Sequence, residues 1–219
     1  MRLSQEEGRV IGSLVEKQLT TPQQYPLTLN ALLLACNQSS NRDPVVEFDE
    51  PTVDNALASL KAAGLVRFVH PSHGRSVTRY QQLLGEHLGL TDQQLALVAV
   101  LLLRGPQTGG ELRSRTERMC ELEGIGQVDV ELEGLSALGE PVVARLPRRP
   151  GQKEERWAQL LTDGSVSMYE QPQRDALDGG TATDLAAEVA ELRGEVAELS
   201  ARVADLRDRL ETLRRDFYP

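Results

Sequence analysis

Apolar residues recur at helical spacing in three successive segments near the start of the chain, and two runs typical of β-strands follow them. The helical segments begin after Ser4, after Pro26 and after Asp49, and the strand runs lie at about 65–70 and 77–83. Ser4 is followed three residues later by a glutamate, which is the pattern of a capping box. This order predicts three helices followed by a β-hairpin.

The same order of elements recurs further along the chain. Capping boxes open predicted helices at Thr91 and Thr108, and a third helix is expected at about 126–138. Strand runs follow at about 142–146 and 156–161. Because the same succession occurs twice, we expect two copies of one structural unit.

Three helices and a hairpin in about 80 residues match the winged-helix plan, and a generic small α+β module is the alternative. The predicted fold is therefore mainly α with small β-hairpins. We expect two tandem winged-helix domains at 1–86 and 87–162, a polar, Gly-rich linker at 163–182, and a C-terminal coiled-coil helix at 183–219.

The C-terminal segment carries an uninterrupted heptad pattern. Its apolar residues alternate spacings of four and three, which is typical of a coiled-coil seam. The flanking charges leave parallel and antiparallel pairing open, and a single helix folding back on its own domain is the alternative. We expect a homodimer through this helix, with a seam formed by Val189, Leu192, Val196, Leu199, Val203, Leu206 and Leu210.

Charge and composition narrow the classes of protein. The chain has 24 basic and 33 acidic residues and a net charge of −9, which excludes a globally basic nucleic-acid binder but allows local basic patches. Its two cysteines are far apart, so a disulfide framework is not expected. The longest apolar run, Leu95–Leu103, is too short to span a bilayer, and a signal peptide is not recognisable. We expect a cytoplasmic protein with no membrane partner.

Motifs for catalysis are lacking in the sequence. It contains no nucleophile elbow, no P-loop and no dinucleotide-binding glycine pattern. His70 and His73 flank a predicted turn and have no nearby cysteine or carboxylate to complete a metal site. We therefore predict a protein that is not an enzyme and that uses no cofactor or metal.

Basic residues gather on the two predicted hairpins, the wings of the winged-helix plan. The third helices are acidic and unsuited to the major groove, but the wings could neutralise backbone phosphates. We predict a DNA-associated regulatory protein, and the alternative is an adaptor that binds another protein through acidic surfaces and the coiled coil. The candidate nucleic-acid contacts are Arg67, His73, Arg75, Arg79, Arg148, Arg149 and Lys153.

An unusually polar stretch follows the second helix. Asn37, Gln38, Asn41 and Arg42 form a candidate polar surface for binding. The interpretation that we favour is structural: the amides cap the helix and satisfy the loop backbone, and Arg42 pairs with a carboxylate of the third helix.

Several motifs in both halves match one family pattern. They include TTPQQYPLTLN at 20–30, NRDPV at 41–45, LLLRG at 101–105 and GELRSR at 110–115. With these motifs the chain resembles the YceH family of bacterial proteins, except that Trp157 stands where that family usually has Tyr. The resemblance implies tandem winged-helix domains. It brings no function and no catalytic residues, because the family is uncharacterised.

Overall fold

We describe a computed structural model of the chain, which places residues 2–70, 77–148, 152 and 154–162. These residues all belong to one compact unit, residues 1–170. The predicted linker at 163–182 and the predicted coiled-coil seam lie outside the described residues. Within the described part the fold is mainly helical with small antiparallel sheets, which confirms the predicted fold class at that level.

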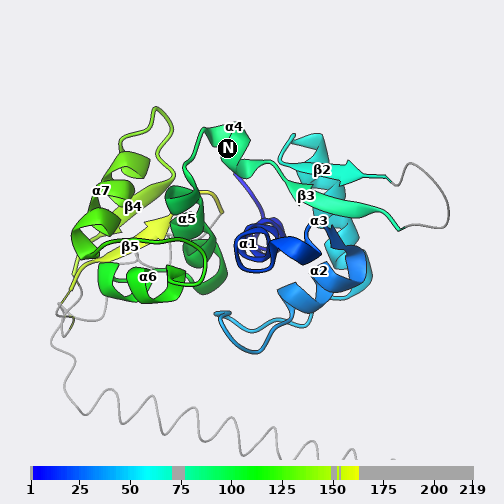
Figure 1. Cartoon of the computed structure of the whole chain (residues 1–219), viewed down its shortest axis with the longest axis horizontal. Helices are drawn as coiled ribbons and strands as arrows, with labels where there is room; N and C mark the ends of the chain where they lie inside the picture. Colours follow the sequence, from blue (N-terminus) through cyan, green and yellow to red (C-terminus); the bar gives the residue numbers. More distant parts are fainter. Residues whose placement is uncertain (1, 71–76, 149–151, 153, 163–219) are drawn as a thin grey trace, which may run out of the picture. The chain divides into compact units, whose positions relative to one another are not determined.

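The first half, residues 2–83, contains three helices and a small sheet (Figure 1). Helix α1 ends where Pro22 begins a short 3-10 turn. Its elements are α1 (Gln5–Thr20), η1 (Pro22–Gln24), β1 (Leu27–Thr28), α2 (Leu29–Cys36), α3 (Glu50–Ala62), β2 (Val66–Val69) and β3 (Arg79–Gln82).

The second half, residues 91–162, repeats this plan after a short connecting helix, α4 (Leu84–Leu88). Helix α4 was not predicted from the sequence. This helix has no side-chain cap and ends at Gly89 with a positive φ of 65°. The second half contains α5 (Asp92–Arg104), α6 (Gly109–Thr116), α7 (Ile125–Ser136), β4 (Val143–Leu146) and β5 (Arg156–Gln159).

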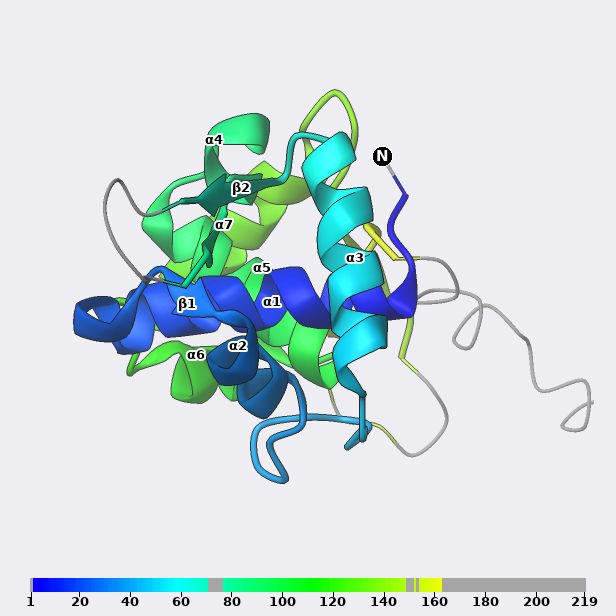
Figure 2. The ribbon, with the colours of Figure 1, turned by 90° about the vertical axis from the view of Figure 1, so that its right-hand side faces the viewer.

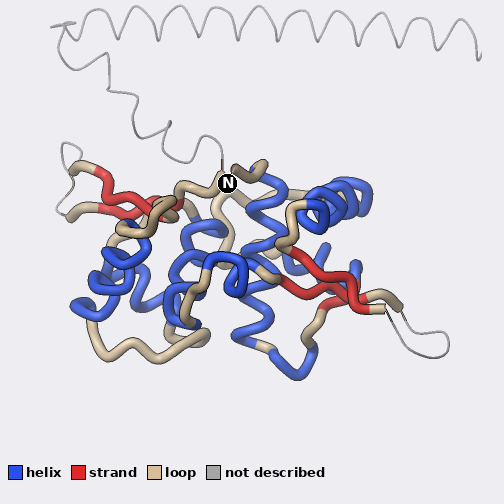
Figure 3. Tube along the Cα trace, turned by 90° about the horizontal axis from the view of Figure 1, so that it is seen from above, coloured by secondary structure: helices blue, strands red, loops and turns tan. Residues whose placement is uncertain are grey.

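The strands of the two halves follow the same scheme. In the first half β3 pairs with both β1 and β2, so the order is β1-β3-β2, and Tyr80 lies opposite Leu27 and Phe68. In the second half β4 pairs with β5, and Gln107 forms an isolated bridge with Trp157 of β5. Gln107 lies just before α6, as Leu27 lies just before α2. The structural repeat between the two halves therefore includes the edge of each sheet. Figure 3 shows these strands as two separate groups with helices between them.

The predicted helix starts are confirmed. Ser4, Thr91 and Thr108 each accept a hydrogen bond from the backbone N–H three residues on, and the Glu or Gln at that position accepts from the capping residue's N–H. Asp49 caps α3 by accepting a hydrogen bond from the backbone N–H of Thr52, without the reciprocal bond. These local bonds satisfy amides that a helix leaves unpaired at its start.

Helices α1 and α5 lie side by side (Figure 2), and one hydrophobic core runs through both halves. Its centre is the contact between α1 and α5, both of which are lined by fully buried aliphatic side chains. Gly12 lets α5 approach closely: a Cβ at this position would lie 3.1 Å from Leu103 Cγ and 3.2 Å from Leu102 Cβ. The halves are also joined by backbone hydrogen bonds, from Leu3 to Leu161 (2.7 Å) and from Asp43 to Leu103 (2.9 Å).

Candidate functional site

The first hairpin presents two of the predicted nucleic-acid contacts. Arg67 in β2 is exposed, and its side chain forms no hydrogen bond or ion pair with another described residue. Arg79 in β3 is also exposed, but its Nη1 donates to the carbonyl oxygen of Pro26 at 2.8 Å. This hydrogen bond holds the residue that precedes β1, so Arg79 has a structural role although it faces solvent. His73 and Arg75 lie outside the described residues.

On the second hairpin two arginines, Arg145 and Arg156, are already paired with carboxylates. Arg145 forms ion pairs of 3.2 Å with Glu133 and with Glu155, and its guanidinium lies 4.7 Å from the centre of the Trp157 ring. Arg156 is bound to Glu111 at 3.0 Å. Arg148 is exposed and has no such partner in the described part of the chain, whereas Arg149 and Lys153 are outside it.

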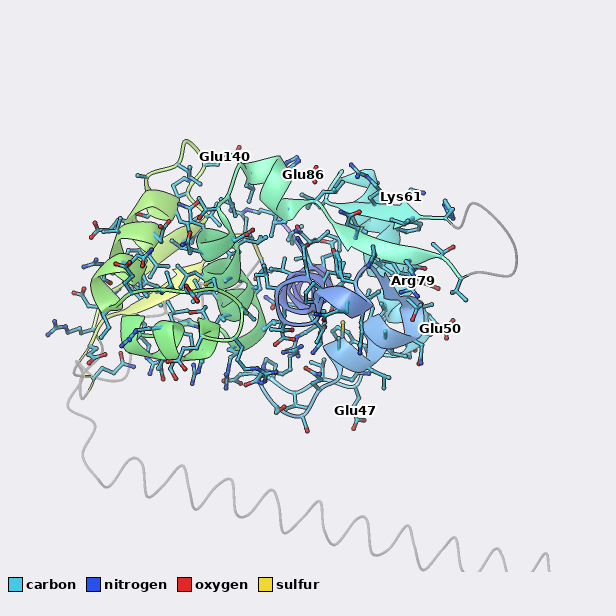
Figure 4. All side chains as sticks on the ribbon, in the orientation of Figure 1. Glu47, Glu50, Lys61, Arg79, Glu86 and Glu140 are labelled. Carbon is cyan, nitrogen blue, oxygen red and sulfur yellow. The ribbon has the colours of Figure 1, made fainter. Side chains whose placement is uncertain are left out.

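The third helix of each half is acidic on its surface, as the sequence indicates. In α3, Glu50 and Asp54 are exposed, and Figure 4 shows the Glu50 side chain pointing away from the first half. Helix α7 contains no lysine or arginine, and its surface includes Ile125 and Val130, which are 50% and 65% exposed. Lys61 is the one basic residue of α3 and α7 has none, so neither helix offers the net positive charge that phosphates attract.

The polar stretch after α2 is mainly structural. Asn37 exchanges two hydrogen bonds of 2.8 Å with the backbone of Phe48, which confirms that it satisfies the loop backbone. The Gln38 side-chain oxygen accepts from Lys17 Nζ at 3.4 Å, and that of Asn41 accepts from Arg104 Nη1 at 3.1 Å.

Arg42 corrects two expectations. Its side chain is fully buried, so it is not part of an exposed polar surface. Its partner is not a carboxylate of the third helix but Glu16 in α1, which accepts two hydrogen bonds of 2.6 and 3.1 Å from the guanidinium. The Arg42 Nε and Nη2 atoms also donate to the carbonyl oxygen of Ala35. A buried guanidinium needs this degree of pairing, and the loop is folded over α1 to supply it.

Arg9 is a second buried arginine, and nothing in the sequence pattern singled it out. It donates to the carbonyl oxygens of Cys36 and Pro44 and so joins α1 to both ends of the polar stretch. Burial, followed by the nearby charge of Arg42, lowers the pKa of Arg9. Burial raises the pKa of the Cys36 thiol to about 11, which makes this cysteine a core residue rather than a reactive nucleophile.

Basic side chains also meet at two adjoining cavities where α1, α5, α6 and the polar stretch come together. The larger has a volume of about 460 Å³ and includes Lys17 and Arg118 in its lining, the smaller has about 340 Å³, and the two share Arg104 and Arg115. This site was not among those predicted from the sequence. The signal that could have found it is the pair Arg115 and Arg118 at the end of a short predicted helix.

Among the described residues there is no group of three or more His, Cys, Asp or Glu side chains placed to hold a metal ion. In the same part of the chain, no helix combines the length and apolar character that crossing a membrane requires.

These features define a helical protein with two repeated helix-and-hairpin halves around one core. Residues 3–152 match the family model described as protein of unknown function, DUF480, and the chain belongs to this family. Similar curated proteins carry the name UPF0502 protein. The one from Solibacter usitatus is 45% identical over 87% of this chain and 93% of its own length, and the one from Pelobacter propionicus is 50% identical over 74% and 73%. The expectation of an uncharacterised bacterial family is thus confirmed.

Proposed function

We propose that this chain is a non-enzymatic, cytoplasmic, DNA-associated regulatory protein with two tandem winged-helix domains. The strand order β1-β3-β2 after three helices supports the winged-helix interpretation of the first half. The bridge between Gln107 and Trp157 supports it for the second half, because it places a short strand equivalent before α6. Membership of the YceH family, which the sequence motifs indicate, is part of the same proposal.

The DNA proposal rests on one observation: each hairpin carries an exposed arginine that has no acidic partner among the described residues. Arg67 and Arg148 are exposed and are not held by acidic neighbours among the described residues, in contrast to Arg145 and Arg156. Uncompensated arginines on protruding hairpins suit contacts with backbone phosphates, which carry no sequence information. The acidic surfaces of α3 and α7 then face away from the duplex.

Fluorescence anisotropy with a labelled random duplex tests this proposal. The purified chain is titrated at several salt concentrations, together with Arg67→Gln, Arg148→Gln and the control Arg113→Gln, an exposed arginine on α6. We expect the slope of log K against log salt to become shallower by about 0.9 for each phosphate that a hairpin variant no longer neutralises. Absence of binding at low salt, or equal slopes in all four proteins, would overturn the proposal.

The alternative function is a protein-interaction adaptor, and helix α7 favours it. Ile125 and Val130 expose apolar side chains on the helix that also carries the acidic residues Asp129, Glu131 and Glu133. Such a surface suits a partner with an apolar centre and a basic rim. If the chain fails to bind duplex DNA while Val130→Lys abolishes a stoichiometric complex with another protein, the adaptor function replaces the DNA-associated one.

Dimerisation through residues 183–219 is a further part of the proposal, and it rests on the heptad pattern alone. Deleting these residues is expected to convert a dimer into a monomer in multi-angle light scattering. A monomer with the full chain would contradict it.

A further inference from the structure

The two adjoining cavities form one basic cleft, which is unusual for a chain with a net charge of −9. Their combined lining has six basic side chains against three acidic ones. The basic residues are Lys17, Arg42, Arg104, Arg115, Arg118 and Arg156, and the acidic residues are Glu16, Asp43 and Glu111.

Two of the three acidic side chains are already engaged by cations of the cleft. Glu16 is bound by the buried Arg42 at 2.6 Å, and Glu111 is bound by Arg156 at 3.0 Å. Glu111 also accepts a hydrogen bond from the backbone N–H of Thr108 at 2.9 Å, as part of the capping box of α6. These carboxylates are therefore poor counter-charges for the remaining cations.

The remaining cations form longer ion pairs, or none, within the described residues. Arg104 donates to the neutral side chain of Asn41, Arg115 is 3.8 Å from Glu111, and Lys17 is 3.4 Å from Glu16. The Arg118 side chain forms no hydrogen bond or ion pair within the described residues. Burial lowers the pKa of Arg104, the positive charges of Arg115 and Arg42 lower it further, and the carboxylates of Asp43 and Glu111 offset this only in part. The fold thus holds like charges together at a cost that a bound anion would offset.

Helix dipoles do not account for this convergence. Lys17 and Arg104 lie in the last turns of α1 and α5, where a single cation is favourable. That effect acts on each helix separately, however, and does not require cations of three helices to line the same space. The neutral groups beside them, including Ser114 and Gln38, add hydrogen-bond donors to the lining.

We propose that this cleft binds a small molecule that carries more than one phosphate group. Arginine recognises phosphate oxygens through paired N–H donors, and Arg104 and Arg115 are placed to serve both cavities. The volumes of about 460 and 340 Å³ are in the range of small-ligand sites. Arg42 is buried and Arg104 and Arg115 are only partly exposed, so the phosphates of a duplex are poorly matched to the cleft. The site is separate from the DNA contacts proposed for the hairpins.

Isothermal titration calorimetry of the full-length protein with pyrophosphate and tripolyphosphate tests this proposal, at constant ionic strength set with chloride. We expect one binding site per chain and affinity at least tenfold weaker in Arg104→Gln and in Arg115→Gln. Arg113→Gln is the matched control, because it removes the same charge two residues from Arg115, on an exposed position outside the cleft lining. Its affinity should equal that of the unmodified chain.

Thermal unfolding of each variant without ligand shows whether it is folded, and the ligand-induced rise in Tm gives a second measure of binding. Lack of binding by the unmodified chain at millimolar pyrophosphate would overturn the proposal. Equal weakening in Arg113→Gln and Arg115→Gln would do so too, because it would indicate a general effect of charge. Displacement of the bound pyrophosphate by duplex DNA would assign the cleft to the DNA surface instead.

Discussion

The carboxylate of Glu16 and the guanidinium of Arg42 form a bidentate ion pair inside the first half, with hydrogen bonds of 2.6 and 3.1 Å. Glu16 lies in α1, and Arg42 lies in the loop between α2 and α3. The pair therefore fixes a polar loop against the helix that also packs on α5. Glu16 lines the larger cavity and Arg42 lines the smaller one, and their pairing neutralises one of the acidic residues of the cleft.

Replacing Arg42 by methionine should destabilise the protein strongly. The substitution leaves the Glu16 carboxylate with one 3.4 Å contact to Lys17 and removes the donors to Ala35. Loss of one partner of a buried ion pair costs about 3–5 kcal/mol. Urea denaturation followed by circular dichroism measures this change. Arg67→Met on the exposed face of β2 is the control and should stay within about 0.5 kcal/mol; similar stability of the two variants would refute the structural role of Arg42.

The same pair predicts a specific pH dependence. Burial by itself would raise the pKa of Glu16, but the hydrogen bonds and charge of Arg42, together with Lys17, outweigh it, and the pKa is lowered. Stability from this carboxylate is complete above its unfolded-state pKa of about 4.3 and is lost as the pH falls through the lower folded-state pKa. The free energy of unfolding should therefore decline below about pH 4.3, and more weakly in Glu16→Gln. Parallel pH curves for both proteins would contradict the assignment.

The close packing of α1 on α5 predicts that Gly12 tolerates no large side chain. Its Cβ position lies within 3.2 Å of Leu102 and Leu103 atoms, so Gly12→Leu forces the two helices apart. We expect a loss of about 3 kcal/mol, at the upper end of overpacking effects. Gly126→Leu is the control, because a Cβ at this position in α7 meets nothing within 4 Å. Chemical denaturation of the two variants would show equal stability if the helices could adjust without strain.

Local sequence patterns predicted most of the elements in the described part of the chain. Ser4, Thr91 and Thr108 were recognisable as helix starts because a capping box depends on residues only three positions apart. The burial of Val53, Leu57 and Leu60 in α3 followed from their spacing on one helix face. Helix α4 was missed because its five residues are too few to show such a face.

The candidate site was much harder to predict, because it depends on contacts between distant residues. Arg42 is bonded to Glu16, which is 26 positions away in the sequence, and Arg104 is bonded to Asn41, which is 63 positions away. Helix and strand periodicity relates only residues that are close in sequence, so it does not indicate either pair. Glu133 is 12 positions from Arg145 and Glu111 is 45 positions from Arg156, and only the folded chain brings these partners together. The cleft likewise exists only once α1, α5 and α6 are packed.

Tyr25 provides a test of the sheet in the first half. Its hydroxyl oxygen accepts a hydrogen bond of 2.6 Å from the backbone N–H of Gln82 in β3, and burial raises the pKa of this phenol to about 12. Tyr25→Phe leaves that N–H without its acceptor and should cost about 1–3 kcal/mol at neutral pH. Because the folded-state pKa is raised, the stability from Tyr25 is complete below its unfolded-state pKa of about 10 and is lost as the pH rises towards 12. The difference in unfolding free energy between the two proteins should therefore shrink across this pH range, as measured by urea denaturation. A difference that stays constant from pH 8 to the alkaline limit would show that the phenol is not held neutral by the fold.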